Sequence, residues 1–351
     1  MASAAFVSFR LGVTDGVSVV ARNWQRAFEQ LGYDVHTVAG DGPVDRTVSG
    51  LAIEATDPPE RSEVRAAIGD VDLVVVENLC TIPLNLPAAR VVAEVLAGRP
   101  AILHHHDPPW QRERWSHVTE LPPRDPAWRH VTINQLTRRE MEERGYHATC
   151  IYNGFPTATG TGDRVGVRRR LGIDDDTLLL AHPVRAIPRK NIPAAVRLAE
   201  QLGGTYWLWG PAEDGYDDEL ARILAHAACP VVRGTSGESA VDLYGAADAV
   251  LFPSTWEGFG NPPVEAAIHR VPCAVGSYPV AAELRALGLE WYPADDPAPL
   301  RRAIAHPDEA RLDRNRRIAV KRLSLDAMRD EIAALLAEPG WLTGRPRRPL
   351  G

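Results

Sequence analysis

The chain contains 351 residues, of which 45% are hydrophobic and 24% charged, a composition typical of globular proteins rather than disordered ones. Its formal net charge is −7 and it has no long basic run, which excludes an ordinary nucleic-acid binder because phosphate binding requires clustered cations. Its apolar stretches are far shorter than the roughly 20 residues of a membrane span. The four cysteines are scattered without a C-x-x-C pair, which disfavours a disulfide scaffold or zinc finger. We expect a cytoplasmic chain without a transmembrane segment, with peripheral membrane association left open.

Short apolar runs alternate with helical patterns through residues 1–155. Hydrophobic residues recur at intervals of three and four from Val17 to Leu31, which predicts a helix that Gly32 ends in the left-handed conformation. The apolar runs lack polar alternation and therefore predict strands covered on both faces, as in a parallel sheet. The predicted elements are strands 5–9, 33–39, 73–77 and 101–105 and a further helix at 88–97.

The alternation restarts after residues 156–163, a Thr- and Gly-rich segment that is predicted to be a linker. A second βαβ series follows at 164–322, and a helix is predicted at 310–337. We therefore predict an α/β fold of two parallel-sheet domains, 1–155 and 164–322, with a hinge near residue 156. The predicted elements are strands 178–181, 205–209, 230–232, 249–252 and 273–275 and helices 193–202, 217–226, 240–246, 263–269 and 280–287.

The segment from Glu257 to Glu265 follows a predicted strand and opens a helix. Gly260 removes a side chain so that backbone N–H groups can approach a ligand. Asn261 is predicted to cap the helix, whose first N–H groups then face an anion or hydroxyl oxygens. The two carboxylates can accept hydrogen bonds from a polyol ligand. The alternative is a tight turn with two solvated carboxylates.

A second segment with the same strand-to-helix setting runs from Arg185 to Asn191 and includes Arg189 and Lys190. A guanidinium can hold a phosphate through two parallel bonds, an ammonium adds a point charge, and the following helix adds its dipole. Taken alone, three basic residues in a loop are more often a solvated surface. Together with the glutamate segment, they favour a diphosphate site.

These two segments together resemble the retaining glycosyltransferases of family 4, which have the GT-B fold. The resemblance implies two Rossmann-like parallel-sheet domains facing a cleft, with the C-terminal helix and tail (323–351) packing back on domain 1–155. The resemblance is strongest from 178 to 283 and includes two further pieces, 151–154 before the linker and 242–248 ahead of the strand that leads to Glu257. It implies a nucleoside-diphosphate sugar donor, UDP- or GDP-linked, that is held mainly by the second domain. No metal or other cofactor is expected, because the cations would replace it.

The resemblance also implies roles for single residues. Arg185 and Lys190 would bind the diphosphate, and Glu265 would accept hydrogen bonds from the ribose hydroxyls. Glu257 and the backbone from Phe259 through Gly260 to Asn261 would face the sugar.

Two sites in the first domain complete the implied set. His106, the last residue of His104-His105-His106, would reach a hydroxyl of the donor sugar, and the alternative is a buried histidine paired with Asp107. Adjacent strand residues face opposite sides, so the three histidines cannot form one metal site. Gly16 would meet the phosphate through its backbone, although Asp15-Gly16 replaces the glycine pair more usual in the family.

The predicted activity is a metal-independent, retaining transfer of a hexosyl group to a hydroxyl acceptor: a small molecule, a glycan or a lipid-linked molecule. The aromatic and basic segment 108–115 is a candidate acceptor site, and an ordinary packed surface segment is the alternative. Two other functions stay open: a nucleotide-sugar epimerase on the same fold, and a non-catalytic sugar-nucleotide-binding partner. The basic C-terminal tail suits either an anionic surface or a solvated terminus.

Overall fold

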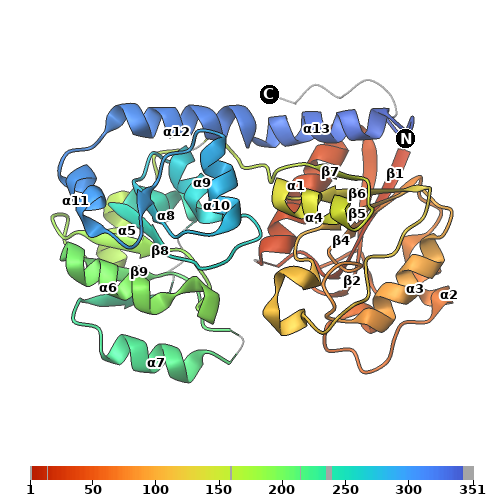
Figure 1. Ribbon diagram of the computed structural model, residues 1–351, viewed down its shortest axis with the longest axis horizontal. Helices are drawn as coiled ribbons and strands as arrows, with labels where there is room; N and C mark the ends of the chain where they lie inside the picture. Colours follow the sequence, from red (N-terminus) through yellow and green to blue (C-terminus); the bar gives the residue numbers. More distant parts are fainter. Residues whose placement is uncertain (1, 14, 159, 214, 235–238, 343–351) are drawn as a thin grey trace. The chain divides into compact units, whose positions relative to one another are not determined.

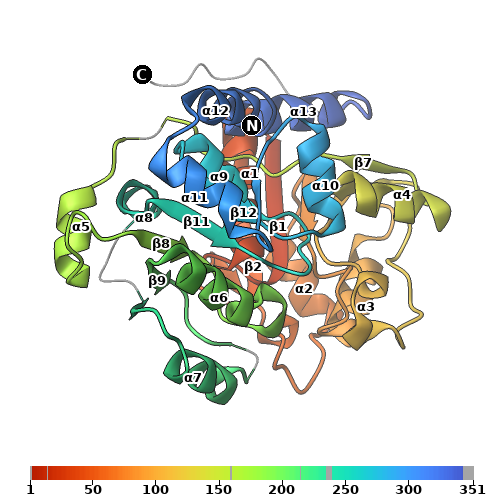
Figure 2. The same ribbon diagram turned by 60° about the vertical axis from the view of Figure 1, so that its left-hand side comes forward.

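A computed structural model describes the chain except residues 1, 14, 159, 214, 235–238 and 343–351 (Figures 1 and 2). The chain divides into two compact units. Unit 1 comprises residues 1–155 and 325–351, and unit 2 comprises residues 156–324. Each unit is built on one parallel sheet, so the prediction of two α/β parallel-sheet units is confirmed. The basic tail at 345–348 lies outside the described residues.

The described residues of unit 1 form a seven-stranded parallel sheet. Its central strands are buried on both faces: Val74 and Val76 enter one hydrophobic core, and Leu73 and Val75 enter the other. This division explains why the sequence of that strand shows no polar alternation. In sheet order the strands are β3 (Arg46–Thr47), β2 (Tyr33–Asp41), β1 (Ala2–Arg10), β4 (Leu73–Glu77), β5 (Ala101–His105), β6 (Trp128–Thr132) and β7 (Ala148–Cys150).

The helices of unit 1 cover both faces of this sheet. Trp24 and Phe28 of α1 share one core with Ile332 and Leu336 of the C-terminal helix α13, and the Tyr33 hydroxyl donates to the carbonyl of Trp341. The C-terminal helix therefore packs on unit 1, as expected. The helices are α1 (Gly16–Gln30), α2 (Arg61–Ile68), α3 (Leu86–Leu96), α4 (Gln135–Glu143) and α13 (Leu325–Ala337).

The single helix predicted at 310–337 is wrong, because two helices occupy this range. The first, α12 (Glu309–Arg322), ends before Leu323, and α13 begins at Leu325. The backbone N–H of Leu325 donates to the carbonyl of Phe155, a bond outside any helix, so the helical ladder is interrupted here.

The described residues of unit 2 form a six-stranded parallel sheet. In sheet order its strands are β10 (Val231–Arg233), β9 (Thr205–Leu208), β8 (Leu179–His182), β11 (Ala249–Phe252), β12 (Cys273–Val275) and β13 (Tyr292–Pro293). The remaining helices are α5 (Arg164–Leu171), α6 (Ile192–Leu202), α7 (Asp217–Ala225), α8 (Ala240–Ala246), α9 (Asn261–Ile268), α10 (Pro279–Ala286) and α11 (Pro297–Ala305). Figure 2 shows β8 and β11 with the helices α6 and α9 that follow them. Because β9, β8 and β11 are neighbours, the loops after them meet at one edge of the sheet.

Candidate active site

The two segments that sequence analysis selected in unit 2 lie against each other. The basic segment follows β8 and the glutamate segment follows β11, its neighbour in the sheet. The backbone N–H of Thr255 donates to the carbonyl of Arg189 at 2.9 Å, and Asn191 Nδ2 donates to the carbonyl of Pro253 at 3.3 Å. These bonds fix the two loops as one structure at the carboxyl edge of the sheet.

Lys190, Arg189 and Glu257 form a buried ion cluster at this edge. Lys190 Nζ lies 2.5 Å from Glu257 Oε1, and the Arg189 guanidinium binds Oε2 of the same carboxylate. Lys190 and Glu257 expose only 9% and 5% of their surface. Two cations therefore share one anion, which leaves a net positive charge. Sequence analysis named Arg189 in its segment but assigned it no role.

Burial shifts the protonation equilibria of this cluster. Burial alone would raise the pKa of Glu257, but Lys190 and Arg189 outweigh it and hold that pKa below its ordinary value. Burial lowers the pKa of Lys190 to about 8, against the opposing effect of Glu257. The lysine is therefore charged at neutral pH and loses its proton just above it.

Arg185 lies on the side of the site nearer to β9. Its guanidinium pairs with Glu213 Oε2 at 2.6 Å, and both side chains are more than one-third exposed. An exposed pair of this kind is weak, so the guanidinium can exchange partners at little cost. The pairing of Arg185 with Glu213 was not predicted from the sequence.

Glu265 lies in α9 and is held by Tyr244 of α8. The Tyr244 hydroxyl donates to Glu265 Oε2 at 2.6 Å, and its ring stacks on His269 with centroids 5.0 Å apart. Burial raises the pKa of Glu265, while the tyrosine bond partly offsets this effect. Tyr244 fixes the orientation of the carboxylate, a role that its sequence position did not reveal.

The start of α9 differs from the prediction. Gly260, not Asn261, is the N-cap, and Asn261 is the first helical residue. Gly260 has φ +99°, and a Cβ there would lie 2.3 Å from the Tyr278 hydroxyl, so only glycine fits. Phe259 is buried. Among the described residues the buried Tyr278 hydroxyl has no hydrogen-bond partner, which places an unused polar group beside Gly260.

In unit 1 the alternative pairing considered for His106 is wrong. His106 Nε2 lies 2.9 Å from Glu77 Oε2, whereas Asp107 pairs with Arg112. His104 Nδ1 lies 2.9 Å from the same Glu77 oxygen.

The side chains of Glu77, His104 and His106 could together bind a metal ion. The sequence argument about adjacent histidines missed this possibility. His105 does face the other side of the sheet, where it contacts Thr81 and His130. His104 and His106, however, share a face with Glu77 of the neighbouring strand, and their potential ligand atoms lie within 4.8 Å of one another. Two histidines spaced by two on a strand, beside a strand that ends in glutamate, were the available signal.

Gly16 begins α1, whose N-terminus is already capped by the preceding residue. Asp15 accepts hydrogen bonds from the backbone N–H groups of Val17 and Ser18. A phosphate at this helix start would compete with the Asp15 carboxylate for these donors. The approach of a phosphate to Gly16 therefore stays a prediction.

The candidate acceptor segment 108–115 forms two 3₁₀ turns. Trp110 Nε1 donates to Glu140, and the Arg144 guanidinium lies 4.3 Å from the centre of the Trp110 ring. These contacts favour the packed surface segment, the alternative left open by the sequence.

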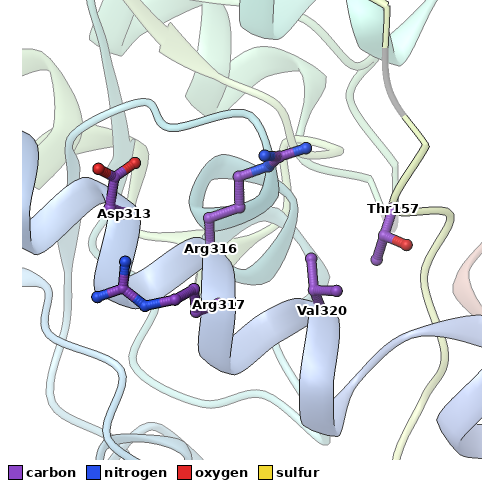
Figure 3. Close-up of a pocket in the computed structure, with 5 residues that line it drawn as sticks. All are labelled: Thr157, Asp313, Arg316, Arg317 and Val320. Atoms are coloured by element: carbon purple, nitrogen blue, oxygen red, sulfur yellow. The ribbon is translucent and has the colours of Figure 1, made fainter.

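Two pockets lie away from the ion cluster. One, of about 330 Å³, is lined mainly by apolar residues of α3 and of the loop after β4, including Leu79 and Ile82. The other, of about 270 Å³, is lined by α12 and Thr157 (Figure 3). Its Arg316 and Arg317 side chains point in different directions, so they do not form one anion clamp (Figure 3). No helix within the described part of the chain is long and apolar enough to span a membrane.

The chain is similar in sequence to several known proteins. No family model matches the chain. The mannosylglucosylglycerate synthase of Thermotoga maritima is 24% identical, and the match covers 83% of this chain and 84% of that protein. The D-inositol 3-phosphate glycosyltransferase of Mycobacteroides abscessus is 33% identical over a segment covering 36% of this chain and 31% of that protein.

Solved structures share the whole fold. HepE of Anabaena, crystallised with UDP-glucose, superposes with a TM-score of 0.71 and 20% identity, covering 96% of this chain and 99% of HepE. The lipopolysaccharide glycosyltransferase WaaG superposes with a TM-score of 0.68 and 13% identity, covering 97% of this chain and all of WaaG. The two parallel-sheet units thus have the architecture of these proteins.

Proposed function

We propose that this chain, a family 4-like glycosyltransferase with the GT-B fold, is a retaining and metal-independent hexosyltransferase that uses a UDP- or GDP-linked sugar. The observation that carries the proposal is the buried cluster of Lys190, Arg189 and Glu257 at the carboxyl edge of the unit 2 sheet. Its net positive charge lies beside the N-terminus of α6, where a diphosphate is favoured. HepE, whose crystals contain UDP-glucose, has the same fold.

The remaining groups fit a donor extended along this edge. Arg185 and Lys190 bind the diphosphate, and Glu265, oriented by Tyr244, accepts hydrogen bonds from the ribose hydroxyls. Glu257 and the backbone of Phe259, Gly260 and Asn261 face the sugar. In support of this role, the buried backbone of Gly260 approaches the unpartnered Tyr278 hydroxyl so closely that no Cβ fits between them.

The transfer depends on stabilising the leaving group. Negative charge grows on the β-phosphate as the glycosidic bond breaks, and Lys190 with the helix N-terminus stabilises that charge more than the charge of the intact donor. The acceptor attacks from the side of the leaving group, and the departing phosphate takes the acceptor proton. No carboxylate nucleophile is required.

The experiment is a donor and acceptor screen of the purified chain. UDP- and GDP-linked hexoses are offered with hydroxyl acceptors, among them glucosylglycerate, because two relatives are named for a mannosyl derivative of it. We expect nucleotide release and a glycoside with the donor's anomeric configuration, unchanged by EDTA. An inverted product, or activity lost with EDTA, would refute the proposed mechanism. Each donor is also incubated alone, where formation of its epimer would identify an epimerase instead.

The pKa of Lys190 predicts the alkaline side of the pH–rate profile. Because this pKa is lowered to about 8, Lys190 loses its charge as pH rises through about 8, and kcat/KM should fall there rather than near the ordinary 10.5. Glu257 raises the pKa of Lys190, so removing its charge should move the fall to lower pH. The chain has only two lysines, Lys190 and Lys321, so a ¹⁵N-lysine NMR titration resolves both, with exposed Lys321 as the control. A Lys190 signal that titrates near the ordinary 10.5 would contradict this prediction.

A further inference from the structure

Glu77 is a buried carboxylate to which the proposed function assigns no role. It is the last residue of β4, and none of its surface is exposed. Its Oε2 atom lies 2.9 Å from His104 Nδ1 and 2.9 Å from His106 Nε2. Burying a carboxylate this deeply costs free energy unless hydrogen-bond donors compensate its charge. The two imidazoles provide this compensation.

The geometry indicates an ionised Glu77. Its Oε2 atom faces two imidazole nitrogens at 2.9 Å each, and a protonated oxygen could donate to only one of them, whereas an ionised oxygen can accept from both. An ionised carboxylate only accepts hydrogen bonds, so both imidazole nitrogens that face it must carry protons. The carboxylate therefore selects the protonation site of each ring.

The two histidines differ in what their other ring nitrogen can reach. His104 Nε2 is buried without a partner among the described residues, and the His104 ring lies 4.1 Å from that of Trp24. Its position allows it to hold Glu77 and excludes contact with a ligand.

In His106 the second ring nitrogen, Nδ1, is available to accept a hydrogen bond. With Nε2–H donated to Glu77, a neutral ring leaves Nδ1 as an acceptor, and the hydrogen bonds of the described residues do not use it. The His106 backbone N–H donates to Asn78 Oδ1, and Asn78 itself has φ +59°, a conformation that is uncommon for a residue other than glycine. Both the backbone and the ring of His106 are thus fixed.

We propose that Glu77 is a positioning residue for the transfer reaction. Backed by His104, it holds the His106 ring in the Nε2–H form and so presents Nδ1 as a hydrogen-bond acceptor for a substrate hydroxyl. The inference rests on the proposed function, since the hydroxyl that His106 Nδ1 would accept from belongs to a substrate of the proposed transfer. The same logic operates wherever a carboxylate orients a histidine whose other nitrogen meets a substrate.

The first test compares steady-state kinetics of Glu77→Gln, His106→Gln and the double variant. A hydrogen bond to a charged group is worth enough to change kcat about 10- to 100-fold, and we expect losses of this size in both single variants with little change in donor KM. If Glu77 acts through His106, the double variant is no slower than His106→Gln alone. Multiplying losses, or a normal kcat in Glu77→Gln, would overturn the inference.

Thr81→Val is the matched control. Thr81 lies 2.6 Å from His105 Nδ1, an equally buried bond on the opposite face of β5. Its loss tests whether disturbing any buried histidine of this strand slows the enzyme, and we expect kcat to stay within about twofold of wild type. A loss as large as that of Glu77→Gln would overturn the inference in favour of a general packing effect.

The second test does not depend on activity. Long-range ¹H–¹⁵N NMR of ¹⁵N-histidine protein, with His106 assigned from His106→Gln, should show the Nε2–H form in wild type and a mixture in Glu77→Gln. The same spectrum in both proteins would overturn the inference even if every donor screen failed. An equivalent of transition metal in the purified protein that disappears in Glu77→Gln would also overturn it, because the cluster would then be a metal site.

Discussion

Replacing Lys190 with methionine is expected to lower kcat by about 100- to 1000-fold, the usual effect of losing one group that stabilises charge developing in the transition state. The fold should survive, because Glu257 keeps its bond to Arg189. The pKa of Lys190 lies below its ordinary value, which means that folding disfavours its charge below pH 8 and that methionine removes this penalty. Initial rates at saturating donor measure the loss of kcat, and circular dichroism checks that the fold survives.

Lys321→Met is the matched control for this experiment, since Lys321 is the only other lysine and lies exposed on α12. Its kcat should equal that of wild type. A wild-type kcat in Lys190→Met itself would contradict the assignment of this lysine to the leaving group.

The position of the ion cluster could be predicted from the sequence, but the pairing of its charges could not. Strand, loop and helix patterns placed the segments of Lys190 and Glu257 at one edge of a parallel sheet, because the carboxyl ends of such strands coincide. The pattern did not indicate that the two charges would bind each other, since pairing depends on side-chain geometry within the loops. The roles of these residues toward a donor stay predictions.

Contacts between polar groups that lie far apart in the sequence could not be predicted. Tyr244 precedes Glu265 by 21 residues, and Glu77 precedes His104 by 27, so each pair meets only when helices or strands pack. The prediction of the N-cap of α9 was wrong for a local reason. Asparagine is a favoured N-cap, but the backbone here needs a positive φ at the cap, and Gly260 supplies it. Composition and periodicity carry no information on these choices.

Glu257→Gln should affect stability more than any other substitution in unit 2 considered above. Glutamine keeps the shape but leaves the buried Lys190 and the partly exposed Arg189 without their anion, and breaking a buried pair costs about 3–5 kcal/mol. Thermal unfolding should therefore begin at a clearly lower temperature. Glu213→Gln is the matched control, since it removes the partner of the half-exposed Arg185 and should cost no more than about 1 kcal/mol.

Added UDP or GDP should distinguish a ligand site from a structural ion cluster in this variant. A pyrophosphate bound by Lys190 has to share this lysine with Glu257 in the wild type, but in Glu257→Gln the competing carboxylate is gone. At equal nucleotide concentration the rise in unfolding temperature should therefore be larger in the variant than in the wild type, because a ligand that binds only the folded state stabilises it more when its dissociation constant is lower. Equal or smaller rises would mean that Lys190 serves the fold alone, since the affinity of a diphosphate that contacted Lys190 would change when the competing carboxylate is removed.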